Sequence, residues 1–327
     1  MRLHKLSSMI LAAAVVCYAV VAQATVTIVT VPIGNLNNAN DSTGYGAVGY
    51  AYNIAKNETT IGQYAEFLNA VAKTDTYNLY SSSMTTSYIN GISQGGVSGS
   101  YTYTVAAGSG NKPITYVSWF DAARFSNWMH NGQLSGLQTA ATTERGAYTL
   151  DGATSGVNVS KNAGAKFWIP SENEWYKAAY YDPNKGGAGV GGYWPYPTQS
   201  KTLAGNTVGV ANSANYWDGD YVGYPGMALT DVGAYGLNSD SFYGTNDQGG
   251  NVWEWNDAVI GSSRGVRGGS WDNNSSLLAS SYRHFYSGPS YENLSLGFRV
   301  ASVPEPGSLI LIVSGAIVAL ILWRRRK

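Results

Sequence analysis

A glycine- and tryptophan-rich stretch, GGNVWEWNDAVIGSSRGVRGGSW, constrains the fold of this chain more than any other feature. Its two Gly-Gly pairs let backbone segments pass close to one another or adopt positive φ. Trp253 and Trp255 alternate about Glu254, so in an extended segment both indoles face one way and the carboxylate faces the other. Glu254 is therefore predicted to be buried, where a carboxylate needs a cation or several hydrogen-bond donors.

Residues 1–24 have the pattern of a secretory signal peptide. The segment has a basic start, an apolar run and a small-residue cleavage site at Ala22-Gln23-Ala24. A buried apolar helix is the alternative, and the lysine and A-x-A flanks argue against it. We expect the mature protein to begin near Thr25.

The other end carries an apolar run, residues 309–323, that is short for a bilayer span of about 20 residues and is followed by four cations. It predicts a transmembrane anchor with its basic end in the cytoplasm. Together with Val303-Pro304-Glu305-Pro306, the segment 304–327 resembles the PEP-CTERM sorting signal of Gram-negative bacteria. That resemblance implies exosortase-type sorting machinery as a partner, and delivery to the cell surface or an extracellular polysaccharide matrix.

The segment between the two ends offers little for several kinds of chemistry. Residues 25–303 contain 14 Lys and Arg against 19 Asp and Glu, a net charge of −5 that argues against nucleic acid as a partner. The single cysteine, Cys17, lies in the predicted signal peptide, so the mature chain has no thiolate ligand and no thiol nucleophile. His130 and His284 are too few for a three-histidine metal centre.

Three helix starts are predicted from capping boxes, at Thr60–Gln63, Ser118–Asp121 and Ser171–Glu174. Aromatic and aliphatic residues follow each box at helical spacing, and we expect them to pack in the core. The stretch 75–112, rich in Gly, Ser and Tyr, is predicted to be a surface insertion around a short strand.

Six motifs occur in a fixed order between residues 46 and 301: NETTIGQYAEFLNAV, PITYVSWFDAARFSNWM, IPSENEWYKAAY, GGNVWEWNDA, RGVRGGSW and LGFRVA. Their order resembles the formylglycine-generating enzyme family, also called the sulfatase-modifying factor domain. The resemblance implies one ectodomain over residues 25–303 with an α+β fold. That fold is similar to C-type lectins, with few regular strands and much ordered loop.

The resemblance also implies structural calcium. The implied ligands of the first ion are two carboxylates and two backbone carbonyls, on Asp247, Gly250, Val252 and Glu254. A second ion would use Asn215, the Tyr216 carbonyl and either Asp218 or Asp220, of which we select Asp220. Such oxygen ligands suit a hard ion. The alternative is that the acids of the first site cap a turn and pair with arginine.

The family's copper site is not expected here. Enzymes of the family hold Cu(I) through two thiolates, and the corresponding positions in this chain are Asn273 and Leu278. A related branch that uses an iron site with several histidines is excluded by the histidine count. A hydrolase built on Ser270 and His284 is weakly supported, because Gly-Gly-Ser is explained as a turn in this fold. No catalytic residue is predicted.

The segment 267–299 lines the substrate groove in the family. We predict that this chain binds a ligand there through aromatic, amide and arginine side chains: Trp271, Asn273, Arg283, His284, Tyr286 and Tyr291. Arg267 and Arg299 are instead expected to form internal salt bridges. The predicted function is a non-catalytic, surface-associated protein that binds a polysaccharide, peptide or protein. The alternative is an oxidoreductase of the same family with an unrecognised metal site.

Overall fold

The computed structural model describes residues 25–86, 88–203, 205–222, 229–236, 238–286 and 288–304. The predicted signal peptide and the apolar run 309–323 lie outside these residues. Among the described residues, no helix combines the length and the apolar character needed to cross a membrane.

One four-stranded sheet joins the two ends of the described chain. Its order is β1 (Thr30–Ile33), β2 (Tyr52–Ala55), β12 (Ala301–Ser302) and β5 (Phe167–Trp168). All three pairings are antiparallel, with Ala301 opposite Ile54 on one side and Trp168 on the other. β12, which begins at the last residue of the final motif, is therefore held between β2 and β5.

The second four-stranded sheet contains the tryptophan-rich stretch. Its order is β10 (His284–Phe285), β9 (Ser263–Arg267), β8 (Trp253–Ile260) and β11 (Leu296–Gly297). The stretch forms the β8–β9 hairpin, in which Glu254 lies opposite Arg267 and the register shifts between Trp255 and Val259. β10 pairs only with β9, so it is an edge strand of this sheet.

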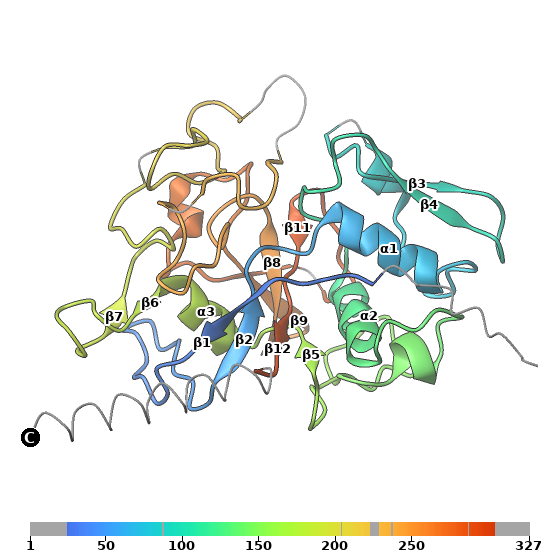
Figure 1. The fold of residues 1–327 in the computed structure, drawn as a ribbon, viewed down its shortest axis with the longest axis horizontal. Helices are drawn as coiled ribbons and strands as arrows, with labels where there is room; N and C mark the ends of the chain where they lie inside the picture. The colour runs from blue at the N-terminus through green and yellow to red at the C-terminus, as the bar shows by residue number, and fades with distance from the viewer. Residues whose placement is uncertain are drawn as a thin grey trace, which may run out of the picture.

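The described residues form three α-helices, α1 (Ile61–Val71), α2 (Trp119–His130) and α3 (Glu172–Tyr180). Each predicted capping box is present, with the N-cap side chains of Thr60, Ser118 and Ser171 accepting from the backbone three residues on. The predicted helix starts are confirmed. Figure 1 shows α1 and α2 on one side of the central strands β8 and β11, and α3 on the other.

The remaining elements are short. They are two hairpins and three single-turn helices: β3 (Ile92–Gly95), β4 (Thr102–Val105), β6 (Tyr181–Asp182), β7 (Gly192–Tyr193), η1 (Ser82–Thr85), η2 (Ala140–Glu144) and η3 (Ser275–Leu278). The β3–β4 hairpin belongs to the stretch 75–112 and extends beyond α1 (Figure 1). Asn69 of α1 fixes it by bonding both the amide and the carbonyl of Tyr103, at 2.9 and 2.8 Å. The hairpin is thus hydrogen-bonded to α1.

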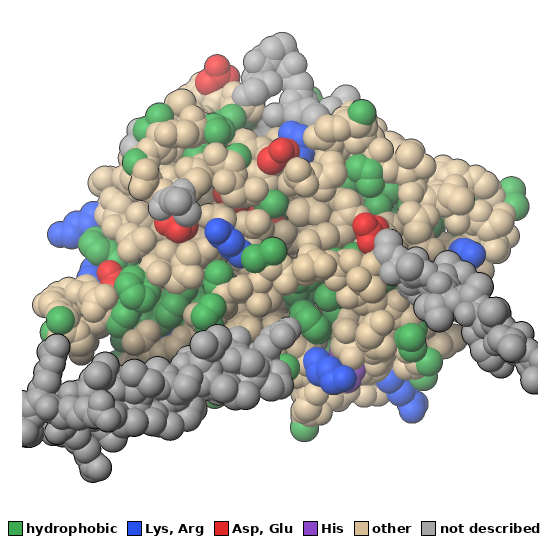
Figure 2. Space-filling view, in the orientation of Figure 1, with side chains coloured by type: hydrophobic (Ala, Val, Ile, Leu, Met, Phe, Trp, Pro, Cys, Tyr) green, Lys and Arg blue, Asp and Glu red, His purple; other side chains and the backbone are tan. Residues whose placement is uncertain are grey.

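The core between α1 and α2 is aromatic. Phe67 and Phe125 lie 5.4 Å apart between ring centroids, and Phe298 contacts Phe125 at the same distance. Charged side chains are scattered over the face shown in Figure 2, which is mostly uncharged. Few regular strands, three helices of 9 to 12 residues and much ordered loop confirm the predicted fold class.

Candidate ligand-binding site

A row of aromatic side chains follows the edge strand β10 and the loop after it. We call it the aromatic strip, and it consists of Tyr282, His284, Phe285, Tyr286 and Tyr291. Tyr286 and Tyr291 are stacked with centroids 4.7 Å apart and planes 20° apart. His284 lies 5.2 Å from Tyr286, and Phe285 is 51% exposed. The strip therefore has one exposed ring, Phe285, and four partly buried ones.

Two tryptophans of β8 support the strip. The Trp253 ring lies 5.4 Å from His284, and the Trp255 ring lies 6.3 Å from Tyr286. Both indoles are buried, and Trp255 Nε1 donates to the Val117 carbonyl at 3.0 Å. Asn293 Nδ2 donates to the Tyr291 hydroxyl at 3.1 Å. These contacts hold the strip in place before any ligand binds.

Burial shifts the pKa of two polar groups of the strip, Tyr286 and His284, toward the uncharged form. Burial, and then the charge of Asp272, raise the pKa of Tyr286 above its usual range, so its phenol stays protonated. Burial lowers the pKa of His284, which favours the uncharged imidazole. Flat rings with neutral hydrogen-bonding groups suit a sugar or another uncharged ring ligand.

Arg283, next to the strip in sequence, points into an ion triad. Its Nη2 lies 2.6 Å from Glu172 Oε2, and Arg267 Nε donates to Glu172 Oε1 at 2.9 Å. The expectation that Arg267 forms an internal salt bridge is confirmed. The structure thus brings three of the six predicted ligand-binding residues together in the strip: His284, Tyr286 and Tyr291.

Trp271 and Asn273 belong to a different group of contacts. The Trp271 ring lies 5.4 Å from that of Tyr221. The Asn273 carbonyl accepts from the Trp217 amide at 2.9 Å, and its Oδ1 accepts from Ser270 Oγ at 2.8 Å. Their role in ligand binding stays a prediction.

The two positions that correspond to the family's thiols do not fit copper. Leu278 is fully buried in a small cluster with Ala214 and Tyr216, and its carbonyl accepts from the Tyr180 hydroxyl at 3.0 Å. Asn273 presents an amide. An isobutyl group in a core and a hydrogen-bonded amide provide no soft ligand for Cu(I).

Glu254 is fully buried, as predicted, and its cation is Arg299. Arg299 Nε donates to Oε2 at 2.6 Å and Nη2 donates to Oε1 at 2.7 Å. Trp175 Nε1 adds a third bond to Oε2 at 2.7 Å. The predicted salt bridge of Arg299 is confirmed. Glu254 therefore has three donors on its two oxygens, and its role as a calcium ligand stays a prediction.

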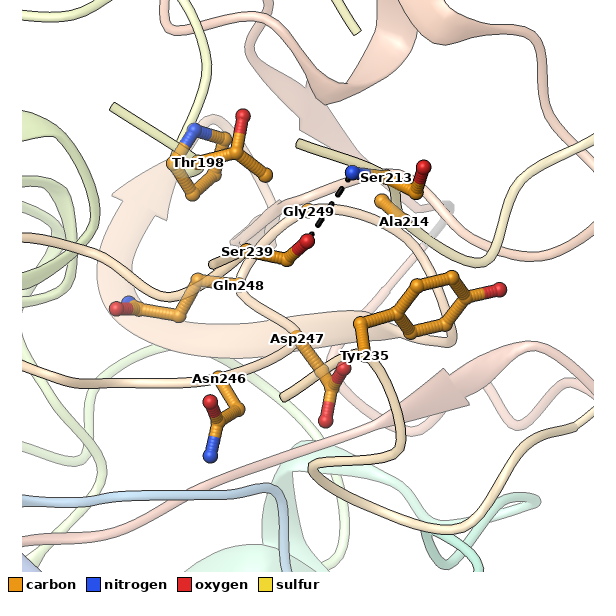
Figure 3. A pocket seen from close by; sticks show the side chains of 10 residues that line it. Thr198, Ser213, Ala214, Tyr235, Ser239, Asn246, Asp247, Gln248 and Gly249 are labelled. Carbon is orange, nitrogen blue, oxygen red and sulfur yellow. Dashed lines mark hydrogen bonds between the residues drawn. The ribbon is translucent and has the colours of Figure 1, made fainter. Parts of the chain in front are cut away.

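Asp247 has fewer hydrogen-bond donors than Glu254. The residue has φ +57, lines a cavity of about 10 Å³ shown in Figure 3, and accepts one backbone bond, from Gly233 at 2.5 Å. Burial raises its pKa to about 6, although the Gly233 hydrogen bond and Arg299 act in the opposite direction. The cavity has room for about one water molecule or ion.

Glu58 is a buried acid near Asp247 that the sequence did not single out. It is 2% exposed, and neither carboxylate oxygen has a hydrogen-bond partner among the described residues. Burial, and then the charge of Asp247, raise its pKa well above its usual range. Its position in the sequence, two residues before the Thr60 cap, did not indicate that it would be buried without a hydrogen-bond partner in the described part of the chain.

Gly250 and Val252, the other two predicted ligands of the first calcium ion, have different surroundings. The Gly250 amide donates to the Gly268 carbonyl at 2.9 Å, and Val252 is fully buried. The described residues contain no group of three or more His, Cys, Asp or Glu side chains arranged to hold a metal ion. The first calcium site stays a prediction, centred on Asp247.

The second predicted calcium site is divided between two hydrogen-bond networks. Asn215 Nδ2 donates to Asn251 Oδ1 at 3.0 Å. The carbonyls of Tyr216 and Asp220 both accept from Asn206 Nδ2, at 3.0 and 2.9 Å. Asn206 therefore joins two of the three predicted ligands.

Comparison with known proteins identifies two sequence signatures and a shared fold. The profile of the Sulfatase-modifying factor enzyme 1-like domain matches residues 19–303, and that of the PEP-CTERM protein-sorting motif matches residues 302–327. No curated protein matches the chain. Treponema denticola variable protein 1 is similar in structure, with a TM-score of 0.50 and 20% identity over 86% of this chain and 98% of that one.

Two further solved structures are similar at lower scores. CarF is 20% identical, with a TM-score of 0.47, over 85% of this chain and 99% of its own. PvdO from Pseudomonas aeruginosa is 15% identical, with a TM-score of 0.44, over 85% of this chain and 92% of its own. At these identities the likeness concerns the fold alone.

Proposed function

The chain belongs to the sulfatase-modifying factor enzyme 1-like domain family and carries a PEP-CTERM sorting motif, and from this premise we propose that it is a non-catalytic surface protein that binds a polysaccharide. The sorting motif indicates export and anchoring at the membrane or cell surface of a Gram-negative bacterium. It also indicates recognition by exosortase-type sorting machinery. The ligand and the absence of catalysis are the proposed part.

The aromatic strip is the observation that carries this proposal. The stacked pair Tyr286 and Tyr291 and the half-exposed Phe285 present ring faces that can pack on sugar rings. Trp253 and Trp255 support the strip from below, so little ordering is needed when a ligand binds. A peptide or protein ligand is the other outcome of the binding test.

The alternative function, an oxidoreductase of the same family, lacks the two cysteine thiolates that hold copper in that family. The single cysteine lies at position 17, before the described residues, and the thiol positions hold Asn273 and Leu278. A family oxidoreductase would have to use a metal site built from other residues. Copper therefore has no place in the proposal.

A structural calcium ion beside Asp247 remains part of the proposal. Asp247 and Glu58 are buried carboxylates, and the nearest guanidinium, Arg299, is already bonded to Glu254. Buried acids in excess of their cations favour binding of a positive ion. Glu254, in contrast, is assigned to the ion pair.

Binding arrays of glycans and of peptides test the ligand class, with the purified full-length protein and two variants. We expect glycans to bind, and Phe285→Ala to weaken that binding about tenfold because a ring face is lost. Tyr88→Ala removes a 59% exposed ring outside the strip and is the matched control. Binding to peptides only, or equal glycan binding by all three proteins, would overturn the proposal.

A further inference from the structure

A second site lies where α2 begins. It is a polar pocket of about 350 Å³, within the roughly 300–1,000 Å³ typical of small-molecule sites. Four separate segments provide its walls, and the side chains that matter here are Tyr77, Asp121, Arg124, Ser155, Ser290 and Glu292. Ser290 and Glu292 flank Tyr291 of the aromatic strip in sequence. The pocket and the strip are thus built on the same loop.

Asp121 brings a buried carboxylate to the pocket. The residue is only 3% exposed, and its Oδ2 accepts from the amide and the hydroxyl of Ser118, at 2.8 and 2.6 Å. Its Oδ1 has no hydrogen-bond partner among the described residues. One oxygen therefore caps the helix, and the other is available to a ligand.

Glu292 brings the second carboxylate. It is half-buried and close enough to Asp121 for its charge to raise the pKa of Asp121, after burial as the main cause, to about 8. Burial also raises the pKa of Glu292 itself. Each acid is thus less stable as an anion in the empty pocket than in water.

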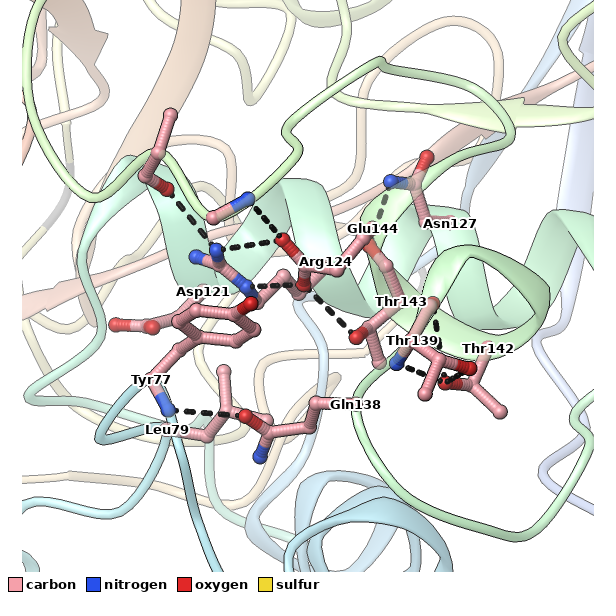
Figure 4. A network of polar contacts seen from close by, with 12 residues as sticks. Tyr77, Leu79, Asp121, Arg124, Asn127, Gln138, Thr139, Thr142, Thr143 and Glu144 are labelled. Carbon is pink, nitrogen blue, oxygen red and sulfur yellow. Dashed lines mark hydrogen bonds and ion pairs between the residues drawn. The ribbon is translucent and has the colours of Figure 1, made fainter.

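The arginine that lines the pocket is hydrogen-bonded to a different acid, and its charge lowers the pKa of Asp121 less than burial raises it. Arg124 Nε and Nη2 donate to Glu144 at 2.8 and 3.0 Å, and Nη2 also donates to the Ala153 carbonyl. Its guanidinium lies 4.2 Å over the Tyr77 ring. Figure 4 shows this network with the Asp121 carboxylate outside it. Arg124 and Glu144 are paired, so among the described lining residues no cation is hydrogen-bonded to Asp121 or Glu292.

We infer that this pocket binds the protonated amino group of an amino sugar in the proposed polysaccharide. The ammonium group would pair with the free oxygen of Asp121 and with Glu292, and the sugar hydroxyls would meet Ser155 and Ser290. An N-acetylated sugar would bring no positive charge and so would not stabilise the ionised form of either acid. This inference rests on the proposed function and adds the chemical class of its ligand.

Two oligosaccharides of equal length test the inference by calorimetry on the purified full-length protein: the hexamers of glucosamine and of N-acetylglucosamine. We expect the glucosamine hexamer to bind at least about tenfold more tightly, the size of one charged hydrogen bond. Glu292→Gln should remove about that factor for glucosamine and leave the affinity for N-acetylglucosamine unchanged. Glu66→Gln, on the exposed face of α1, is the charge-matched control.

Asp121→Asn is a second variant, because an amide oxygen can still accept the capping bond from Ser118. Equal affinity for the two hexamers, an unchanged preference in both pocket variants, or no binding of either hexamer overturns the amino-sugar inference. Tighter binding of the N-acetylglucosamine hexamer would refute the amino-sugar inference. If Phe285→Ala abolished that binding, the polysaccharide proposal would still stand. Failure of every glycan on the array would overturn both.

Discussion

Arg299 and Glu254 form a bidentate ion pair in which both side chains are 0% exposed. Arg299 Nη1 also donates to the carbonyls of Ala55 and Lys56, each at 3.0 Å, and Nη2 donates to that of Asn246. The pair therefore connects the sheet that contains β2, the tryptophan hairpin and the loop before it. Breaking one partner of a buried pair leaves an uncompensated charge, which is costly.

We predict that Glu254→Gln lowers the free energy of unfolding by about 3–5 kcal/mol. Urea unfolding of the wild type and the variant measures the difference. Asp151→Asn is the control, because Asp151 and its partner Arg145 are largely exposed and should add little measurable stability. A loss for Glu254→Gln as small as that of the control would contradict a stabilising role for the buried pair.

We predict that calcium stabilises the protein by binding at Asp247 and not at Glu254. We expect calcium to raise the melting temperature of the wild type and of Glu254→Gln by similar increments over a chelator. Asp247→Asn should lose most of that increment, because it removes the charge that an ion would balance. Scanning calorimetry in calcium and in chelator decides the point. No increment in the wild type would refute calcium binding.

Asp121 predicts a pH dependence of stability. Its folded pKa is raised to about 8 from an ordinary value of 3.8, so between these values the native state holds a proton that the unfolded chain has lost. The contribution of Asp121 is therefore fully present below about pH 4 and declines as the pH rises toward 8, by up to about 1.4 kcal/mol per pH unit. Asp121→Asn should show a shallower decline in urea unfolding between pH 5 and 8. Parallel curves would count against the raised pKa.

Formylglycine formation is not expected. The full-length protein, with copper and oxygen supplied, should leave a cysteine-containing sulfatase peptide unchanged in mass, because the thiol positions are Asn273 and Leu278. An enzyme of the family that has both cysteines is the positive control. Conversion of the peptide would overturn the non-catalytic proposal.

Alanine substitutions at Gly250 and Gly219 distinguish the cost of a strained backbone from the cost of steric overlap. Both have φ +87, but a Cβ on Gly250 would overlap the Asn215 carbonyl oxygen, while Gly219 has nothing within 4 Å. Gly219→Ala should cost about 1 kcal/mol from the left-handed conformation alone. Gly250→Ala should cost at least about 2 kcal/mol more, because it also overpacks the contact. Equal losses in urea unfolding would show that the close approach is unimportant.

The sequence by itself determined the features that depend on near neighbours. The three capping boxes were predictable because each set of hydrogen bonds spans three residues, and burial of Glu254 followed from its place between two tryptophans. The order of the six motifs gave the family and the fold class. The PEP-CTERM motif was readable for the same reason, since it is contiguous in the chain.

Only the tertiary structure decided which groups meet across the chain. Arg299 lies 45 residues from Glu254, and the spacing between them does not show that a guanidinium occupies both carboxylate oxygens. Tyr286 and Tyr291 stack although they are five residues apart, whereas Arg283, one residue before β10, is held by Glu172 from α3. Glu58 and the pocket that contains Asp121 and Glu292 were not predicted, because burial and the meeting of acids depend on distant segments that sequence spacing does not bring together.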